Sequence, residues 1–140
     1  MNGRDRCFAD TNIWFYSLSN EDESKRDASQ KLIEVAGENL CFSSQIINEI
    51  SVNLKKKAKV DENEIRHFIK SLFLNYRFVS IDEEVLTLAS GLREAVAVSF
   101  WDSFVVAAAL VSECETLYTE DMQHGRLIDG RLTIINPFLN

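Results

Sequence analysis

The strongest constraint on the fold is the alternation of short apolar runs with longer segments of helical periodicity. The short runs read as strands, and they lie at residues 7–9, 40–42, 77–79, 117–118 and 132–135. The segments between them carry apolar residues at helical spacing. Strands that alternate with helices favour an α/β fold with a parallel sheet covered on both faces.

Helices are predicted over residues 12–18, 28–36, 44–59, 61–74, 82–93 and 99–112. The polar residues 19–27 are predicted to form a loop that runs into the second helix. Gly37 is the expected stop of that helix, and Ser43 or Ser44 is the expected cap of the next one.

The chain has 140 residues, of which 46% are hydrophobic, with one Pro and five Gly. This length and composition predict one compact domain over residues 1–140, with no disordered linker. The three cysteines are odd in number and show no C-x-x-C spacing. They argue against a zinc site or a disulfide framework and fit a reducing cytoplasm.

Two segments bear on membranes and export. Residues 1–6 are followed by no apolar signal core. Residues 95–111 resemble a membrane span, but their single charge, Asp102, lies near the middle, where a charge is costly in lipid. We therefore expect a buried helix there, and a cytoplasmic protein without membrane contact.

The net charge is −7, which is unfavourable for binding a polyanion, because such binding normally uses Lys and Arg side chains. Bound divalent cations can reverse the local sign of the charge, so a phosphate substrate is not excluded. The acidic balance predicts weak RNA binding without metal, and it leaves room for a basic protein partner.

Two acids lie at predicted strand ends. Asp10 follows the first strand, and Asp121 lies just past a later one. Ligands of parallel α/β folds bind beyond the carboxyl ends of the strands, so the two carboxylates converge if their strands are neighbours. The alternatives are that Asp10 is only a helix N-cap and Asp121 an ordinary loop acid.

Two further acids lie on predicted helices. Asp102, three residues after Ser99, has the position of a capping-box acid. Its apolar neighbours would make an unpaired charge costly, and a bound cation would offset that cost. Glu49 lies one turn before Asn53, at the flank of an apolar helix face. It can face a cleft, although a solvated position is the ordinary alternative.

Four gathered acids suit Mg²⁺, which takes oxygen ligands and keeps several waters. Such ions activate water and neutralise phosphate, so no Ser–His pair is needed. His67 is expected to be exposed, whereas His124 lies close enough to Asp121 to contact substrate or to be a solvated loop residue. Lys55, Lys56 and Lys57 can guide RNA toward the pocket or simply favour their helix C-terminus.

Four segments, taken together, resemble the PIN-domain nucleases and, more narrowly, the VapC-type toxins of bacterial toxin–antitoxin pairs. They are Asp10-Thr11-Asn12, Ser44-Gln45 to Glu49, Ser99-Phe100-Trp101-Asp102 and Thr119-Glu120-Asp121-Met122-Gln123-His124-Gly125. The resemblance covers essentially the whole chain. The chain departs from the family at residues 95–98, where related chains often carry Gly near the turn. The resemblance therefore does not fix where the helix that carries Asp102 begins.

The resemblance implies a three-layer α/β/α sandwich with a central parallel sheet. Asp10, Glu49, Asp102 and Asp121 would match the acidic metal site, Thr11 and Asn12 the support of the first acid, and Thr119 the hydroxyl position near a strand end. The implied activity is Mg²⁺- or Mn²⁺-dependent endonucleolytic cleavage of RNA by metal-activated water. The implied partners are a second copy of the chain and a cognate antitoxin.

Two rival functions share this layout. A receiver-like domain also binds Mg²⁺ in an acidic pocket and accepts a phosphoryl group. It would need a second acid beside the first strand and a Lys at a late strand end, and no Lys follows residues 117–118 or 134–135. A non-catalytic interaction module on the PIN-like fold is the other alternative, and the retained acids argue against it.

Overall fold

The computed structural model describes residues 6–139 and contains one six-stranded sheet. The strand order is β3-β2-β1-β4-β6-β5. The strands are β1 (Cys7–Ala9), β2 (Leu40–Ser43), β3 (Arg77–Val79), β4 (Thr116–Tyr118), β5 (Leu127–Ile128) and β6 (Leu132–Ile135). The five predicted strands are thus confirmed. Most of the N-terminal segment tested for a signal core lies outside the described residues.

The sheet is parallel except at one edge, where β5 runs antiparallel to β6. The strand β5 was not predicted, because a strand of two residues leaves no periodic pattern. Its connection to β6 passes through Asp129 and Gly130, which both have positive φ angles, 55° and 64°. Asp and Gly tolerate this left-handed conformation, which a tight turn requires.

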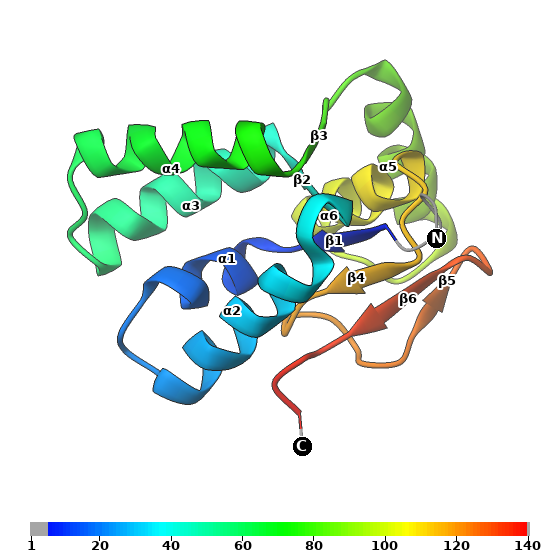
Figure 1. Cartoon of the computed structure of the whole chain (residues 1–140). Helices are drawn as coiled ribbons and strands as arrows, with labels where there is room; N and C mark the ends of the chain where they lie inside the picture. The colour runs from blue at the N-terminus through cyan, green and yellow to red at the C-terminus, as the bar shows by residue number, and fades with distance from the viewer. Residues whose placement is uncertain (1–5, 140) are drawn as a thin grey trace.

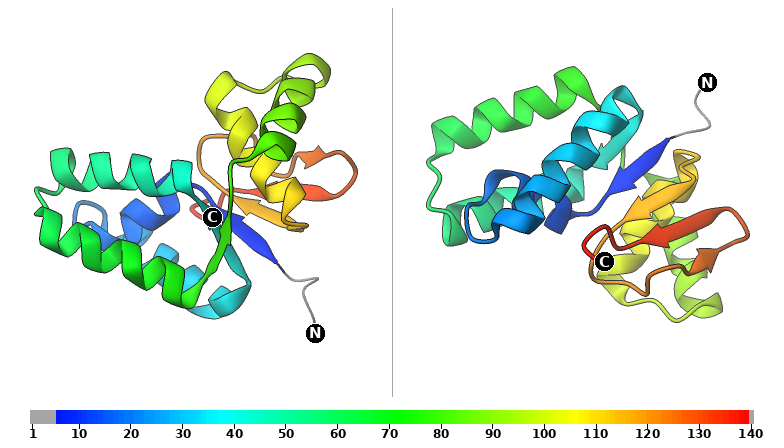
Figure 2. Two further views of the ribbon diagram at one scale, coloured as in Figure 1. Left: turned by 90° about the horizontal axis from the view of Figure 1, so that it is seen from above. Right: turned by 60° about the horizontal axis from the view of Figure 1, so that its bottom comes forward.

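The helices lie in two layers. They are α1 (Thr11–Leu18), α2 (Glu23–Ala36), α3 (Ser44–Lys57), α4 (Glu62–Asn75), α5 (Glu83–Ala95) and α6 (Phe100–Val111), with a short 3₁₀ turn, η2 (Gly37–Asn39). Figure 1 shows α1 to α4 on one side of the sheet and α5 with α6 on the other, as do the two views of Figure 2. The predicted α/β/α sandwich is confirmed.

Short polar side chains fix the starts of the helices. Each N-cap accepts a hydrogen bond from a backbone N–H of the first turn, and the caps are Asp10, Asp22, Ser43, Asp61, Asp82 and Ser99. Such caps satisfy donors that have no partner within the helix. Ser43, rather than Ser44, caps α3. The helix α3 ends at Lys57, two residues earlier than predicted.

The start of α2 was predicted wrongly. The helix begins at Glu23, and the Asp22 carboxylate accepts the Lys25 N–H at 3.0 Å. The first turns of α2 are polar, so they carry no apolar periodicity and their sequence resembles that of a loop. Gly37, with φ of 53°, ends α2 as expected. This early start places Lys25 in the first turn of α2.

The apolar stretch over residues 95–111 is divided between two helices. Ala95 ends α5, extended residues follow, and Ser99 caps α6 without needing a Gly at the turn. The segment Ser103–Leu110 is buried as expected, but Phe100 and Trp101 are 51% and 63% exposed. Within residues 6–139, no helix combines the length and the apolar character that a membrane crossing requires.

The interior is formed by the strands and by the inward faces of the helices. Phe8, Trp14 and Phe42 are among its largest fully buried side chains. All three cysteines, Cys7, Cys41 and Cys114, are free and buried. Strands β1 and β4 are neighbours at the centre of the sheet, so the residues that follow them meet at one edge.

Candidate functional site

Asp10 follows β1 directly and is only 5% exposed. Its Oδ1 accepts the Thr11 N–H at 2.7 Å, and its Oδ2 accepts the Thr119 hydroxyl at 2.8 Å. Asp10 is therefore a helix cap and a pocket residue at once. Burial raises the pKa of Asp10 to about 7, against the lowering effect of these two hydrogen bonds, and the carboxylates of Asp121 and Glu49 raise it further.

Thr11 joins Asp10 to the second acid. Its hydroxyl donates to Glu49 Oε1 at 2.5 Å. Glu49 is half-buried on α3 and lines the same pocket as Asp10, so the flank position predicted from the sequence does face a cleft. Asn53, one turn further along α3, lines this pocket too.

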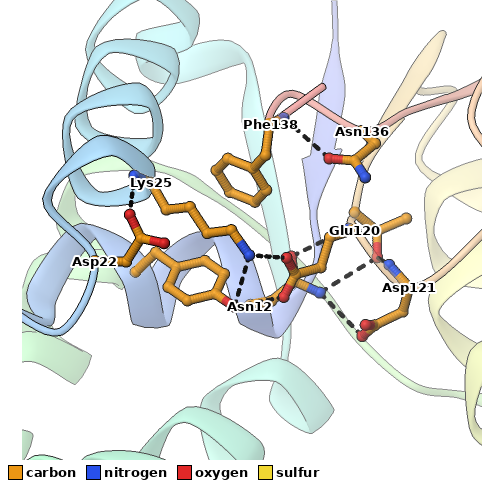
Figure 3. A network of polar contacts seen from close by, with 9 residues as sticks. Asn12, Asp22, Lys25, Glu120, Asp121, Asn136 and Phe138 are labelled. Carbon is orange, nitrogen blue, oxygen red and sulfur yellow. Dashed lines mark hydrogen bonds and ion pairs between the residues drawn. The ribbon is translucent and has the colours of Figure 1, made fainter. Parts of the chain in front are cut away.

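Asn12 holds the third acid. Its Nδ2 donates to Asp121 Oδ2 at 3.0 Å and to Thr119 Oγ1 at 3.3 Å. Thr119 is fully buried, and its Oγ1 also accepts the Asp121 N–H at 3.1 Å. Figure 3 shows Asn12 and Asp121 facing each other across this edge of the sheet. Residues that follow β1 and β4 are thus bound to each other, as neighbouring strands require.

Asp102 lies in the first turn of α6, where its N–H donates to the Ser99 hydroxyl at 3.1 Å. Burial raises the pKa of Asp102, the Ser99 hydrogen bond opposes the shift, and the Asp121 carboxylate adds to it. The side chain is only half-buried, because its neighbours Phe100 and Trp101 point outward. Asp102 is thus less buried than its apolar neighbours in the sequence suggest, and Asp10 is the most buried of the four acids.

The four acids line one pocket of about 630 Å³. Its other lining residues include Thr11, Asn12, Tyr16, Glu21, Gln45, Asn48, Lys57, Trp101 and Glu120. No ion pair among residues 6–139 involves Asp10, Glu49, Asp102 or Asp121. The pocket therefore gathers four carboxylates, none of which forms an ion pair with another described residue.

The chemistry of these donors fits a hydrated hard cation. Within the described chain, no three His, Cys, Asp or Glu side chains lie close enough together to enclose a bare metal ion. Mg²⁺ does not require such a cage, since it usually binds through one or two carboxylates and keeps several waters. Such a cation would stabilise the ionised form of the buried Asp10 carboxylate, because a nearby positive charge favours that form.

The predicted RNA contacts are only partly brought to this pocket. Lys57 lines it, and its Nζ lies 5.6 Å from the Phe15 ring centroid. Lys55 instead pairs with Glu62, with Nζ 2.6 Å from Oε2, and Lys56 is exposed outside the pocket.

Neither histidine lines the pocket. His67 is exposed, as expected. His124 is exposed as well, and its Nδ1 accepts the Asn136 N–H at 3.0 Å. This bond ties the loop after β4 to the segment after β6. His124 therefore lies outside the pocket, and a contact between His124 and substrate stays a prediction.

Several pocket residues were not predicted from the sequence, above all Tyr16, Glu120 and Trp101. Glu120 stands next to Asp121 and Trp101 next to Asp102, so proximity to a candidate acid was a signal for both. Tyr16 lies six positions after Asp10 on α1 and gave no comparable signal.

Comparison with solved structures shows where this fold occurs. A chain of a toxin–antitoxin complex from Klebsiella pneumoniae superposes with a TM-score of 0.72 at 20% identity, over 94% of this chain and 97% of that one. DNA-bound VapBC from Salmonella typhimurium gives 0.66 at 16% identity, over 92% and 97%. VapC20 of Mycobacterium tuberculosis, described as a sarcin–ricin loop cleaving toxin, gives 0.65 at 14% identity, over 82% and 89%.

At these identities the structural likeness is evidence for a shared fold. No curated protein sequence matches the chain. The family model of the PIN domain matches residues 7–128, which is most of the chain and includes all four acids. The chain therefore belongs to the PIN domain family.

Proposed function

We propose that this chain is a Mg²⁺- or Mn²⁺-dependent endoribonuclease that acts, as a single domain, as the toxin of a toxin–antitoxin pair. The observation that carries the proposal is the set of four carboxylates in one pocket, among them the buried Asp10, with no ion-pair partner within residues 6–139. A PIN domain with this pocket supports phosphodiester chemistry better than phosphoryl acceptance or mere protein interaction.

Asp10, Asp102 and Asp121 are the proposed cation ligands, with Glu49 beside them. When bound, the cation would lower the pKa of a water, neutralise the phosphate and stabilise the leaving oxygen. The chain's own groups prepare the site for it. The Thr11 N–H and the Thr119 hydroxyl orient the two oxygens of Asp10, and the Asn12 amide holds Asp121.

The substrate is proposed to be RNA. VapC20, which shares the fold, is described as cleaving the sarcin–ricin loop. A polyanion would meet four carboxylates here, so we expect productive binding only with the cation present. Lys57, at the pocket wall, is the basic side chain placed to contact a phosphate.

Two protein partners are proposed. The structures that share the fold include a toxin–antitoxin complex and DNA-bound VapBC, which supports a cognate antitoxin. The net charge of −7 suits a basic segment in that partner. A homodimer is also proposed, and the exposed apolar side chains of Leu86, Phe100 and Trp101 support it, because contiguous apolar surface marks interaction sites.

The test is cleavage of total cellular RNA by wild type and Asp10→Asn, with the cut sites mapped. We expect cuts at defined sites by wild type with Mg²⁺ or Mn²⁺, and none by Asp10→Asn or in EDTA. Asp27→Asn, at an exposed acid of α2, is the matched control and should cleave as wild type does. Full cleavage by Asp10→Asn would contradict the proposed role of the pocket, and unchanged cleavage in EDTA would contradict the proposed metal dependence.

A further inference from the structure

Glu120 differs from the four candidate acids because its carboxylate is fully engaged. It stands between Thr119 and Asp121 and lines the pocket. Its Oε2 accepts the Tyr16 hydroxyl at 2.6 Å, and its Oε1 accepts Lys25 Nζ at 2.8 Å. The side chains of Lys25 and Glu120 are only 32% and 21% exposed. Glu120 is therefore an ion-paired residue at the pocket wall.

Two aromatic rings lie against the ammonium group of this ion pair. Lys25 Nζ lies 4.8 Å from the Tyr16 ring centroid and 5.4 Å from that of Phe138. The two rings meet edge to face with centroids 5.3 Å apart. The Phe138 N–H donates to Asn136 Oδ1 at 2.9 Å, which fixes the turn that presents its ring. An ammonium over aromatic faces is attracted by them, more strongly where water is displaced.

We call Tyr16, Lys25, Glu120 and Phe138 the Glu120 clamp. Figure 3 shows the side chains of Lys25, Glu120 and Phe138 converging from α2, the loop after β4 and the segment after β6. Tyr16 joins them from α1 through its hydrogen bond to Glu120. Asn12 holds the same loop from the other side, because its Oδ1 accepts the Glu120 N–H at 3.4 Å. The loop that carries Asp121 is thus held at Glu120, both through the Glu120 carboxylate and through the Glu120 N–H.

Asp121 depends on this fixation. Its side chain is exposed, and among residues 6–139 its carboxylate has one hydrogen-bond partner, the Asn12 amide. An exposed carboxylate with a single partner keeps its place only if the adjacent backbone is held. Groups that orient a metal ligand without contacting the metal strongly influence its affinity.

We propose that the Glu120 clamp positions Asp121 for cation binding and that Glu120 is not itself a cation ligand. This inference rests on the proposed function, since it assumes that Asp121 binds a divalent cation. Tyr16, Lys25 and Glu120 are accordingly positioning residues for the pocket.

The variant Lys25→Met separates this role from two others. Removing a positive charge makes the pocket more negative, so a purely electrostatic role of Lys25 predicts tighter cation binding. If Glu120 were a ligand, losing Lys25 would free its carboxylate and again tighten binding. Loss of positioning predicts the opposite result, which is weaker cation binding. The Met side chain should still pack against the rings of Tyr16 and Phe138.

The experiment is calorimetric titration of Mn²⁺ into the full, metal-free chain. We expect Lys25→Met to bind Mn²⁺ about 10-fold more weakly than wild type, as for other groups that orient metal ligands. Lys25→Arg, which keeps the charge, should regain most of the affinity. Lys31→Met, at an exposed position of α2, is the matched control and should bind as wild type does.

Mn²⁺ binding by Lys25→Met that is as tight as wild type, or tighter, would overturn the proposed role of the clamp. If Lys25→Arg bound Mn²⁺ as weakly as Lys25→Met, the ion pair with Glu120 would not be what positions Asp121. If Lys25→Met does not fold, Tyr16→Phe tests the same point, because it removes only the hydroxyl donor and should also weaken Mn²⁺ binding. A wild type that binds no Mn²⁺ rejects the proposed function and the clamp with it, whereas failure of the variants alone rejects only the clamp.

Discussion

The Thr119 hydroxyl donates a hydrogen bond of 2.8 Å to Asp10 Oδ2, although the two residues are 109 positions apart in the sequence. Both side chains are buried, and the bond joins the residues that follow the adjacent strands β1 and β4. Thr119 also accepts hydrogen bonds from the Asn12 amide and the Asp121 N–H. One hydroxyl therefore connects two of the proposed cation ligands.

Thr119→Val should reduce RNA cleavage about 10- to 100-fold, because it removes a group that orients the Asp10 carboxylate. The loss should also destabilise the fold by about 1–3 kcal/mol, since Asp10 keeps a buried acceptor without its donor. Cleavage rate and denaturant unfolding measure the two effects. Thr116→Val, at a partly buried position on the same strand, is the control. Unchanged cleavage by Thr119→Val would remove this bond from the proposed mechanism.

The raised pKa of Asp10 predicts a pH-dependent stability in the absence of divalent cations. The folded pKa is about 7, whereas an unfolded Asp has a pKa of about 3.9. Between these values the folded state binds the extra proton, so the contribution of Asp10 to stability falls by about 1.4 kcal/mol for each pH unit of increase. Above pH 7 both states are ionised and the contribution becomes constant.

Denaturant unfolding in EDTA at pH 5 and pH 7 tests this sign. Relative to Asp10→Asn, which cannot titrate there, wild type should lose stability as the pH rises. Saturating Mg²⁺ should reduce that loss, because a bound cation favours the ionised carboxylate and stabilises the folded state. A stability difference between the two proteins that is the same at both pH values would show that Asp10 does not titrate in this range.

Lys57→Met should weaken RNA binding and lower the slope of affinity against salt concentration by about one charge, as expected when one phosphate contact is lost. Lys57 lines the pocket, whereas Lys55 is paired with Glu62. Lys55→Met is therefore the matched control, with a smaller effect. Salt-dependent RNA titration of the Asp10→Asn background, with Mg²⁺ present, measures both. Equal slopes for the two variants would assign no phosphate contact to Lys57.

Leu86→Glu should convert the proposed homodimer into a monomer, because it places a charge among exposed apolar side chains on α5 and α6. Leu86 is 47% exposed and lines one groove with Trp101, which is 63% exposed. Val35→Glu, at a 77% exposed position on α2, is the control and should stay dimeric. Light scattering after size exclusion reports the mass. A monomeric wild type would reject the proposed homodimer. A dimeric Leu86→Glu would show that the interface lies on another surface.

Much of the fold could be predicted from local pattern. The five longer strands and all six helices follow from runs and periodicities, and the caps at Asp10, Ser43 and Ser99 from single residues. The failures have local reasons as well. The two-residue β5 is too short for a pattern, and the polar first turns of α2 carry no apolar periodicity.

The sequence by itself determined which residues follow strands and which helix faces are apolar. It therefore placed Asp10 and Asp121 at strand ends and Glu49 at the flank of a helix. The tertiary structure alone decided that Asp10, rather than Asp102, is the buried acid, that Thr119 and Asn12 bind the acids together, and that Lys25 reaches Glu120. Periodicity reports the local burial of each segment. Contacts between residues about a hundred positions apart depend on the order in which strands pair, and no local pattern contains that order.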